Sequence, residues 1–253
     1  MSSEERVYSA CLIIIGNEIL SGRTEDRNLA HMAKRLNDLG VRMQEARVIP
    51  DIEETIIETV NECREKFDYV FTTGGIGPTH DDITAETVAR AFGVDIHLHP
   101  EAVGLLTDPG ANAERHDALM LMARVPVGAT LIDNPVSRAP GFQIGNVFVL
   151  AGVPAIMKVM LESARHAIQG GRPVQSRTVS AYLGESQISR PLRDIQDRYP
   201  EVDVGSYPFF SQQRYGTSLV MRGVDEDELA EVMDEVRHMI RGLDGEPIDG
   251  EIE

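Results

Sequence analysis

Three apolar runs, each followed by a segment of helical periodicity, limit the folds open to this chain more than any other feature. Val7–Ile15 is almost continuously apolar, Val41–Ile49 is a second run, and Asp68–Thr73 is a third. Apolar residues recur at helical spacing in the segments 26–39, 50–67 and 85–92. Strands that are apolar on both faces and alternate with helices are typical of parallel sheets with right-handed crossovers. The pattern predicts a three-layer α/β domain with a mostly parallel sheet.

Two loops follow the first and third strands, at the edge of the sheet where ligands bind in such folds. The second loop reads TTGGIGPTHDDIT, and Gly74, Gly75 and Gly77 permit positive φ and close approach of a ligand to the backbone. Thr79 and the N–H groups of the following helix are suited to an anion. The loop lacks the lysine of the P-loop and the last glycine of the dinucleotide fingerprint, so it predicts a phosphate site of another type.

Asp81 and Asp82 lie where the loop meets the helix, and their charge would repel a phosphate. One explanation is structural, since the helix dipole favours an acid in the first turn by about 0.3–1 kcal/mol. The other is a cation, since Mg²⁺ takes carboxylate oxygens together with substrate phosphates. Adjacent side chains diverge, so we expect one aspartate to cap the helix and the other to face the site. A structural turn and a metal-bridged phosphate or diphosphate site both stay open.

Charge and composition argue against several classes of partner. The 253 residues carry a formal net charge of −17, only 5% are aromatic, and lysine and arginine form no cluster. We therefore expect no binding to nucleic acid or to an anionic membrane. The polar N-terminal segment and the lack of a long apolar run predict a cytoplasmic protein. Cys11 and Cys63 have no paired-ligand spacing and are expected to be buried thiols.

A change of pattern at Gly170–Pro173, which reads GGRP, predicts a linker. We expect a first domain at residues 1–169 and a second at residues 174–253. The second domain has strand, helix, strand, strand and helix in order, which predicts a small α+β module of the split βαβ, ferredoxin-like type. Pro191 is expected in the first turn of its helix or at a break. The acidic end of the chain, DGEPIDGEIE, is expected to fray.

The segment GGIGPTHDDIT resembles the GGxGPTxDDxT signature of the CinA-type (competence/damage-inducible protein A) molybdopterin-binding family. Three further segments resemble family motifs in the right order: IIIGNEILSGRTEDRN, NPVSRAPGF and LAGVPAIMKVM. The resemblance covers residues 7–165. It implies the fold of the MoaB/Mog molybdenum-cofactor proteins and of the N-terminal domain of eukaryotic FAD synthases.

The resemblance also implies a ligand and a set of residues. Family members bind the pyranopterin phosphate of molybdopterin, or nucleotides, and some hydrolyse the diphosphate of ADP-ribose or FAD with a divalent metal such as Mg, Mn or Co. By position, Asp82 matches the aspartate that acts with Mg²⁺ in related adenylyltransferases, and Glu18 would complete the metal site. A homo-oligomer is implied as well. The residues matched to ligand binding are Gly16, Asn28, Gly74, Gly75, Gly77, Pro78, Thr79, Asp81, Thr84, Arg138, Pro140 and Gly141.

The chain departs from the family pattern at positions that bear on catalysis. Asn17 replaces an aspartate and Ile156 replaces a glutamate, so two carboxylates are lost while the glycine loop is intact. Three hypotheses stay open: a metal-dependent nucleotide pyrophosphatase, a molybdenum-cofactor biosynthesis protein, and a non-catalytic regulatory or interaction protein. The resemblance does not include the amidohydrolase domain of many full-length members, so nicotinamide-nucleotide deamidation is not expected.

Overall fold

The computed structural model describes residues 6–252, which form two compact units. The first unit ends at Gly171 and the second begins at Arg172, within the GGRP segment. Each unit has its own sheet and its own buried apolar core. The two are therefore described separately.

A six-stranded sheet in the order β2-β1-β3-β8-β7-β6 forms the centre of the first unit. The first four strands in this order are parallel to one another, and β7 and β6 continue the sheet antiparallel. The fold is thus the mostly parallel α/β sheet that the apolar runs predict. The strands are β1 (Tyr8–Ile15), β2 (Val41–Ile49), β3 (Tyr69–Thr73), β6 (Thr130–Ile132), β7 (Gly141–Ile144) and β8 (Val147–Leu150).

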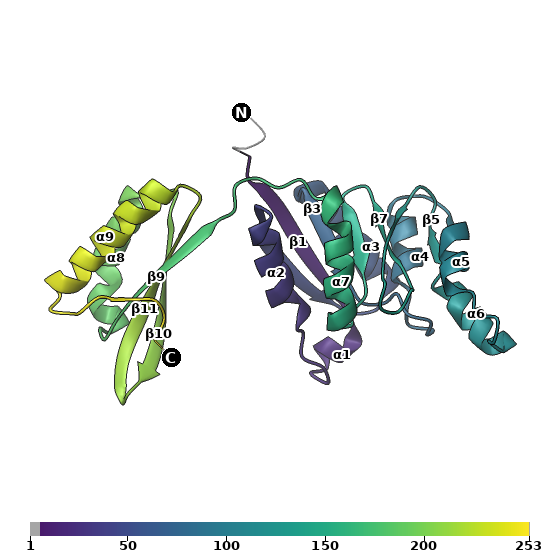
Figure 1. Cartoon of the computed structure of the whole chain (residues 1–253), viewed down its shortest axis with the longest axis horizontal. Helices are drawn as coiled ribbons and strands as arrows, with labels where there is room; N and C mark the ends of the chain where they lie inside the picture. The colour runs from purple at the N-terminus through teal and green to yellow at the C-terminus, as the bar shows by residue number, and fades with distance from the viewer. Residues whose placement is uncertain (1–5, 253) are drawn as a thin grey trace. The chain divides into compact units, whose positions relative to one another are not determined.

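Helices cover both faces of this sheet and make it the middle of three layers (Figure 1). Successive side chains of β1 point to opposite faces, so Leu12 packs with α2 and α7, while Ile13 packs with α3 and α4. This is why the strand is apolar at almost every position. The helices of the unit are α1 (Asn17–Leu20), α2 (Asn28–Asp38), α3 (Glu53–Lys66), α4 (Thr84–Ala91), α5 (Pro100–Leu106), α6 (Ala113–Leu121) and α7 (Pro154–Ala164), with a 3₁₀ turn at Arg165–Ala167.

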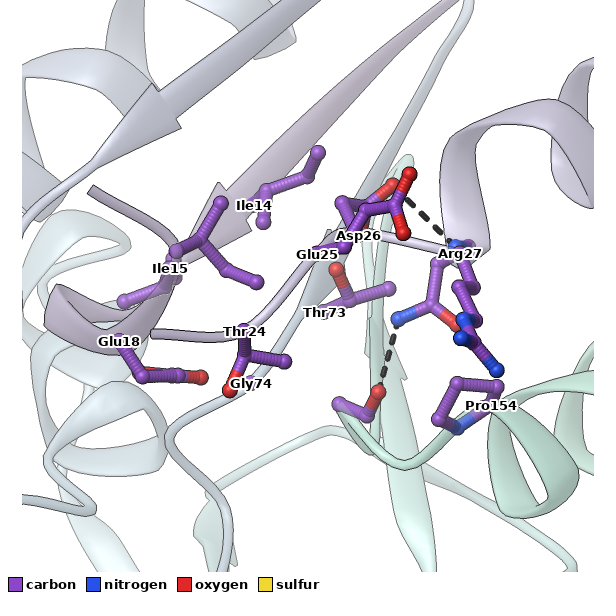
Figure 2. Close-up of a pocket in the computed structure, with 13 residues that line it drawn as sticks. Ile14, Ile15, Glu18, Thr24, Glu25, Asp26, Arg27, Thr73, Gly74 and Pro154 are labelled. Atoms are coloured by element: carbon purple, nitrogen blue, oxygen red, sulfur yellow. Dashed lines mark hydrogen bonds between the residues drawn. The ribbon is translucent and has the colours of Figure 1, made fainter. Parts of the chain in front are cut away.

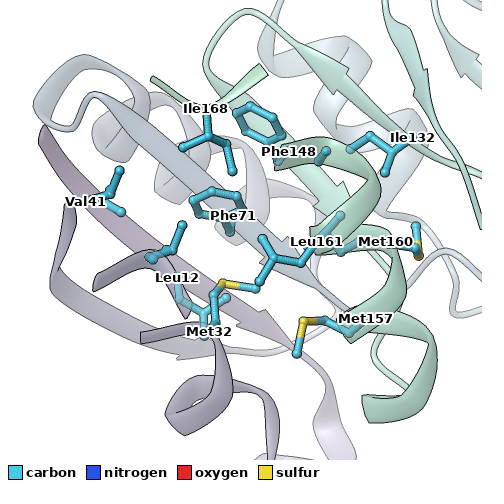
Figure 3. Packing of buried hydrophobic residues seen from close by; sticks show 14 of the residues in the cluster. Leu12, Met32, Val41, Phe71, Ile132, Phe148, Met157, Met160, Leu161 and Ile168 are labelled. Atoms are coloured by element: carbon cyan, nitrogen blue, oxygen red, sulfur yellow. The ribbon is translucent and has the colours of Figure 1, made fainter. Parts of the chain in front are cut away.

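The core between the sheet and the pair α2 and α7 holds the largest buried side chains (Figure 3). Phe71 and Phe148, on neighbouring strands, stack with ring centroids 5.0 Å apart. Met32 of α2 and Met157 of α7 are fully buried against the same cluster. Burial of each such side chain contributes roughly 1.5–3 kcal/mol, so the carboxyl ends of β1 and β3 are held in a fixed relation.

Smaller features of the first unit complete the picture. The strands β4 (Ile96–Leu98) and β5 (Arg124–Pro126) pair antiparallel beside α5 and α6. Cys11 and Cys63 are buried free thiols, as expected, and the structure places their Sγ atoms 3.6 Å apart. Among residues 6–252, none of the helices combines the length and the apolarity needed to cross a bilayer.

The second unit is a four-stranded antiparallel sheet in the order β10-β11-β9-β12, packed against two helices. This order confirms the split βαβ, ferredoxin-like arrangement. The expectation that the acidic end frays is wrong, because β12 pairs with β9 through Ser180 and Val179. Pro191 lies inside the helix α8 rather than in its first turn. The elements are β9 (Gln175–Ala181), α8 (Glu185–Arg198), β10 (Asp203–Ser211), β11 (Arg214–Gly223), α9 (Glu226–Gly242) and β12 (Ile248–Asp249).

Candidate functional site

A pocket opens at the carboxyl ends of the parallel strands, where ligands bind in α/β sheets. Its cavity volume is about 60 Å³, well below the range of about 300–1,000 Å³ that encloses a whole small-molecule ligand, so the pocket can take only one edge of a ligand. Ile15 ends β1, Thr73 ends β3, and Gly152 follows β8, and all three residues line it. The segment from Thr24 to Asn28, before and into α2, closes the pocket from the side (Figure 2).

Two buried oxygen atoms in this pocket have no hydrogen-bond partner among residues 6–252. They are Oδ1 of Asn28, whose side chain is 4% exposed, and Oγ1 of Thr73, which is 1% exposed. Leaving a buried polar atom unsatisfied costs about 1–3 kcal/mol, so native proteins seldom keep such atoms without a use. An amide oxygen only accepts hydrogen bonds, and a hydroxyl both donates and accepts. A ligand that presents N–H or O–H groups would satisfy both atoms.

Asn28 is held by the other end of its side chain. Its Nδ2 donates to the carbonyl oxygen of Gly152 at 2.8 Å, which joins the start of α2 to the turn before α7. Asp26 fixes the same helix start, because its Oδ1 accepts from the backbone N–H of Asn28 at 3.2 Å and of Leu29 at 2.9 Å. A carboxylate in this position satisfies free N–H groups at the helix start. The orientation of Asn28 Oδ1 is thus set by two independent contacts.

The glycine loop begins at the edge of this pocket with Gly74, which has φ 103°. A Cβ atom at this position would lie 2.1 Å from the carbonyl oxygen of Ile15. Positive φ and this close approach of two strand ends both require glycine. Among the described residues, no acceptor is found for the backbone N–H groups of Gly75, Ile76 and Gly77. Successive free N–H groups in a glycine loop form a site for an anion.

Thr84 holds the loop closed from its far end. Its backbone N–H donates to the carbonyl oxygen of Gly75 at 3.0 Å, and its hydroxyl donates to that of Gly74 at 3.1 Å. The side chain is fully buried, and a Cβ at Gly75 would lie 2.2 Å from its hydroxyl oxygen. The structure therefore places this residue, which the family pattern assigns to ligand binding, as the clamp that shapes the loop.

Both aspartates turn back toward Thr79, so the expectation that one of them caps the helix is wrong. The helix α4 begins at Thr84, and its N-cap residue Ile83 makes no side-chain cap. Oδ2 of Asp82 accepts from the N–H of Thr79 at 2.8 Å, and the Thr79 hydroxyl lies 2.5 Å from Oδ2 of Asp82 and 2.5 Å from Oδ1 of Asp81. The hydrogen bond from Thr79 lowers the pKa of Asp81, so this carboxyl is ionised at neutral pH.

The structure brings together only part of the residue set that the family pattern implies. Glu18, Asn28 and Gly74 line the pocket, whereas Asp82 lies in the adjoining loop, where a Cβ at Gly77 would approach its Oδ2 to 2.6 Å. Pro78 is exposed at the turn of this loop. In the chain between residues 6 and 252, no three His, Cys, Asp or Glu side chains gather as a metal cage would require.

The remaining residues of the set lie outside the pocket lining. Gly16 is buried behind the start of α1. Arg138, at φ 66°, is exposed in a separate groove next to α5 and α6. Pro140 is buried, and a Cβ at Gly141 would lie 2.3 Å from the carbonyl oxygen of Val149, so packing explains both residues.

Thr73 and Asp26 are among the pocket residues that the sequence motifs did not single out. Asp26 lies within the segment IIIGNEILSGRTEDRN and Thr73 directly precedes GGIGPTHDDIT, so their position in the loops supplied a signal for each of them. Asn134 was also missed. It is 2% exposed and donates from Nδ2 to Ser137 Oγ at 2.6 Å and to the Ala139 carbonyl at 2.8 Å, which organises the loop before β7.

A sheet with a pocket at its carboxyl edge and a glycine loop beside it defines a ligand-binding α/β domain. The chain belongs to the probable molybdopterin binding domain family, whose model matches residues 11–169. A second family model, the middle domain of FAD synthase, matches residues 173–243. These matches confirm the resemblance that the four motifs indicate.

Individual proteins agree with this assignment. A protein of Archaeoglobus fulgidus is 36% identical over 197 residues, which cover 78% of this chain and 84% of that protein. A probable FAD synthase of Caenorhabditis briggsae is 30% identical over 264 residues and a CinA-like protein of Citrifermentans bemidjiense is 39% identical over 157 residues. The aligned parts span 49% and 38% of those two proteins. The crystal structure of CinA from Thermoplasma acidophilum matches 64% of this chain and 98% of that one, with 31% identity and a TM-score of 0.58.

Proposed function

We propose that the first unit binds a phosphorylated heterocycle, either a molybdopterin-type pterin phosphate or a purine nucleotide diphosphate. The observation that carries the proposal is the pair of unpartnered, buried oxygen atoms of Asn28 and Thr73 beside a loop with free N–H groups. Pterins and purines both present amino or ring N–H groups along one edge. The pocket would take that edge, and the backbone of the loop would take the phosphate.

The charges around the pocket favour a ligand that donates hydrogen bonds there. Glu18, Glu25 and Asp26 line it, and Arg27 is its only cationic side chain among the described residues. A phosphate placed in the pocket itself would meet three carboxylates. The same phosphate at Gly75–Gly77 would meet free N–H groups, and the carboxylate of Asp82, which lies beside Gly77, would be offset by a divalent ion. The edge of the heterocycle therefore belongs in the pocket and the phosphate at the loop.

Calorimetry on the purified protein tests this proposal. Titration with molybdopterin and with ADP-ribose should give saturable binding to at least one of them. The same heterocycle without its phosphate should bind more weakly, because the loop N–H groups then lose their partner. Absence of binding to both ligands, in protein shown to be folded by its thermal unfolding transition, would reject the proposal.

A second candidate is hydrolysis of a nucleotide diphosphate, with a divalent ion bound jointly by protein and substrate. Its support is the donor chemistry, since Mg²⁺ often takes only one or two protein carboxylates and completes its shell with phosphates and water. Asp82 and Glu18 would hold the ion. When bound, such an ion neutralises charge on the diphosphate and polarises it toward attack by water. The chain itself would orient the diphosphate through the N–H groups of the loop.

Turnover separates this candidate from pure binding. ADP-ribose and FAD should each be incubated with Mg²⁺, Mn²⁺ and Co²⁺, and release of AMP measured. Asp82→Asn should abolish the release while ligand binding without metal persists. A protein that binds ligand but releases no AMP with any of the three metals is a carrier, a cofactor-biosynthesis protein or a regulator. The lost carboxylates at Asn17 and Ile156 are consistent with that outcome.

A further inference from the structure

The second unit carries an aromatic surface that the pocket of the first unit does not use. Thirteen residues of the chain are Phe or Tyr, six Tyr and seven Phe, and five of them lie in β10, in β11 and just after β9. Tyr207 and Phe209 alternate with the residues of β10 that face the helices, so they lie on the face of the sheet away from α8 and α9. Tyr182 joins them with its ring centroid 5.6 Å from that of Phe209. We call these three side chains the aromatic platform.

Two rings of the platform lie flat on the sheet because glycine leaves room beneath them. A Cβ at Gly216 would lie 2.3 Å from the ring of Phe209, and one at Gly205 would lie 2.9 Å from the ring of Tyr207. Any larger residue at these two positions would lift the rings from the backbone. A ring that lies against the sheet presents its other face outward. Tyr207 is 46% exposed, and the guanidinium carbon of Arg222 lies over its ring at 5.9 Å from the centroid. The surface is thus suited to stacking with a planar group.

The ring of Tyr182 stands upright beside the rings of Phe209 and Tyr207, and the cation of Arg214 lies next to it. Its ring plane is inclined by 71° to that of Phe209. The guanidinium carbon of Arg214 lies over the Tyr182 ring at 4.1 Å from its centroid. Arg214 has no carboxylate partner among the described residues, so its hydrogen-bond donors are available to an anion.

The charge around this end of the platform is unlike that of the rest of the chain. Although 41 of the 253 residues are acidic, none lies in 176–184 or in 206–218. Arg214 lies at this end of the platform, whereas Arg177 pairs with Met221 toward the other end of β11. The other end of the platform differs, because Arg222 lies opposite Asp203 on the neighbouring strand and its guanidinium already donates to the Tyr207 hydroxyl at 3.3 Å. An anion would therefore be favoured at Arg214 and not at Arg222.

Addition of a further strand at β10 does not explain the surface. This strand is at the edge of its sheet, but Pro208 in its middle has no N–H to donate, and the N–H of Val204 already donates to the side chain of Gln196 at 2.8 Å. Proline and occupied N–H groups block pairing at a sheet edge. The binding surface is the face of the sheet and not its edge.

We infer that the aromatic platform binds a planar heterocycle carrying a phosphate, such as a flavin or purine mononucleotide. The ring stacks on Phe209 and Tyr207 against the wall of Tyr182, and the phosphate pairs with Arg214. This site is independent of the pocket in the first unit.

Calorimetric titration of the full chain with flavin mononucleotide tests the inference. Phe209→Leu keeps Gly216 covered but removes the aromatic face, and Arg214→Gln removes the cation. Each should weaken the binding of flavin mononucleotide to the platform about tenfold, in line with the loss of one stacked ring or one charged contact. Riboflavin lacks the phosphate, so its binding should be weakened by Phe209→Leu and should not change in Arg214→Gln.

Two matched controls lie on the same unit but outside the platform. Tyr215→Leu removes an aromatic side chain that is 77% exposed on the other face of β11, and Arg177→Gln removes a cation of β9; neither should change the titration. Binding at the first-unit pocket persists in all four variants, so failure of that proposal would not be mistaken for failure of this one. Equal affinity and stoichiometry in wild type and all variants would overturn the inference. Binding of a single-stranded oligonucleotide without binding of any mononucleotide would also overturn it.

Discussion

Thr73→Val provides a direct test of the binding pocket, because it should raise the stability of the protein and lower its affinity for the ligand. The Thr73 hydroxyl is 1% exposed and has no hydrogen-bond partner among the described residues. Valine keeps the shape of the side chain and suits a strand at least as well. Removing an unsatisfied buried hydroxyl should therefore raise the free energy of unfolding by about 1–2 kcal/mol. For a unit of this size the melting temperature should rise by about 2–8 °C.

Ligand binding should change in the opposite direction. If the hydroxyl makes one neutral hydrogen bond to the heterocycle, its loss costs about 0.5–1.5 kcal/mol, so Kd should rise roughly 2- to 12-fold. Urea unfolding measures the first effect, and calorimetry with ADP-ribose or molybdopterin measures the second.

Thr72→Val is the matched control for this substitution. Thr72 is the preceding residue of β3 and does not line the pocket, and its buried hydroxyl also has no hydrogen-bond partner among residues 6–252. This variant should gain similar stability and bind the ligand as wild type does. If Thr73→Val is less stable than wild type while Thr72→Val is more stable, the Thr73 hydroxyl is satisfied in solution and the reasoning from the unpartnered atom fails.

Three further predictions concern the frame around the two sites. Gly74→Ala should lower the free energy of unfolding by about 3 kcal/mol or more in urea, because its Cβ would meet the Ile15 carbonyl oxygen at 2.1 Å and φ is 103°. The hydrogen bond from the Arg35 guanidinium lowers the pKa of Glu162 from its ordinary value of 4.5, so this ion pair stabilises the fold above that value and is lost as pH falls through the lower folded pKa. Glu162→Gln should thus be less stable than wild type at neutral pH and equal to it near pH 2, as measured by urea unfolding at both. Gln213→Gly should stabilise the β10–β11 turn by up to about 1 kcal/mol in thermal unfolding, since φ is 61° there; a loss of stability would show that the glutamine side chain makes contacts of its own.

Periodicity predicts the sheet well because both faces of β1 and β3 are buried by helices, and this burial requires apolar residues at nearly every position. The glycine loop can also be predicted from the sequence, since positive φ at Gly74 and Gly75 favours glycine at both positions. The start of α4 is harder to predict from the sequence. The start of α4 depends on the clamp by Thr84, and nothing in the local sequence distinguishes this from a helix that begins at the aspartates.

The pocket itself depends on residues that the chain brings together only in three dimensions. That the Thr73 hydroxyl lacks a partner is a property of what surrounds it and not of its own position in the motif. The strand β12 is similar, because its two residues carry no strand pattern and pair only since β9 presents a free edge. Contacts of this kind cannot be read from a single segment.

The hydrogen bond between Asn28 and Gly152 has a consequence for how the protein is made. It joins residues 124 positions apart, and β3 lies between β1 and β8 in the sheet. An N-terminal fragment that ends before Gly152 therefore lacks one side of the pocket. While β8 has not yet emerged from the ribosome, the nascent chain can form local helices but not this site. Ligand present during synthesis would therefore act late, by retaining the completed sheet, and not early as a template for the first strands.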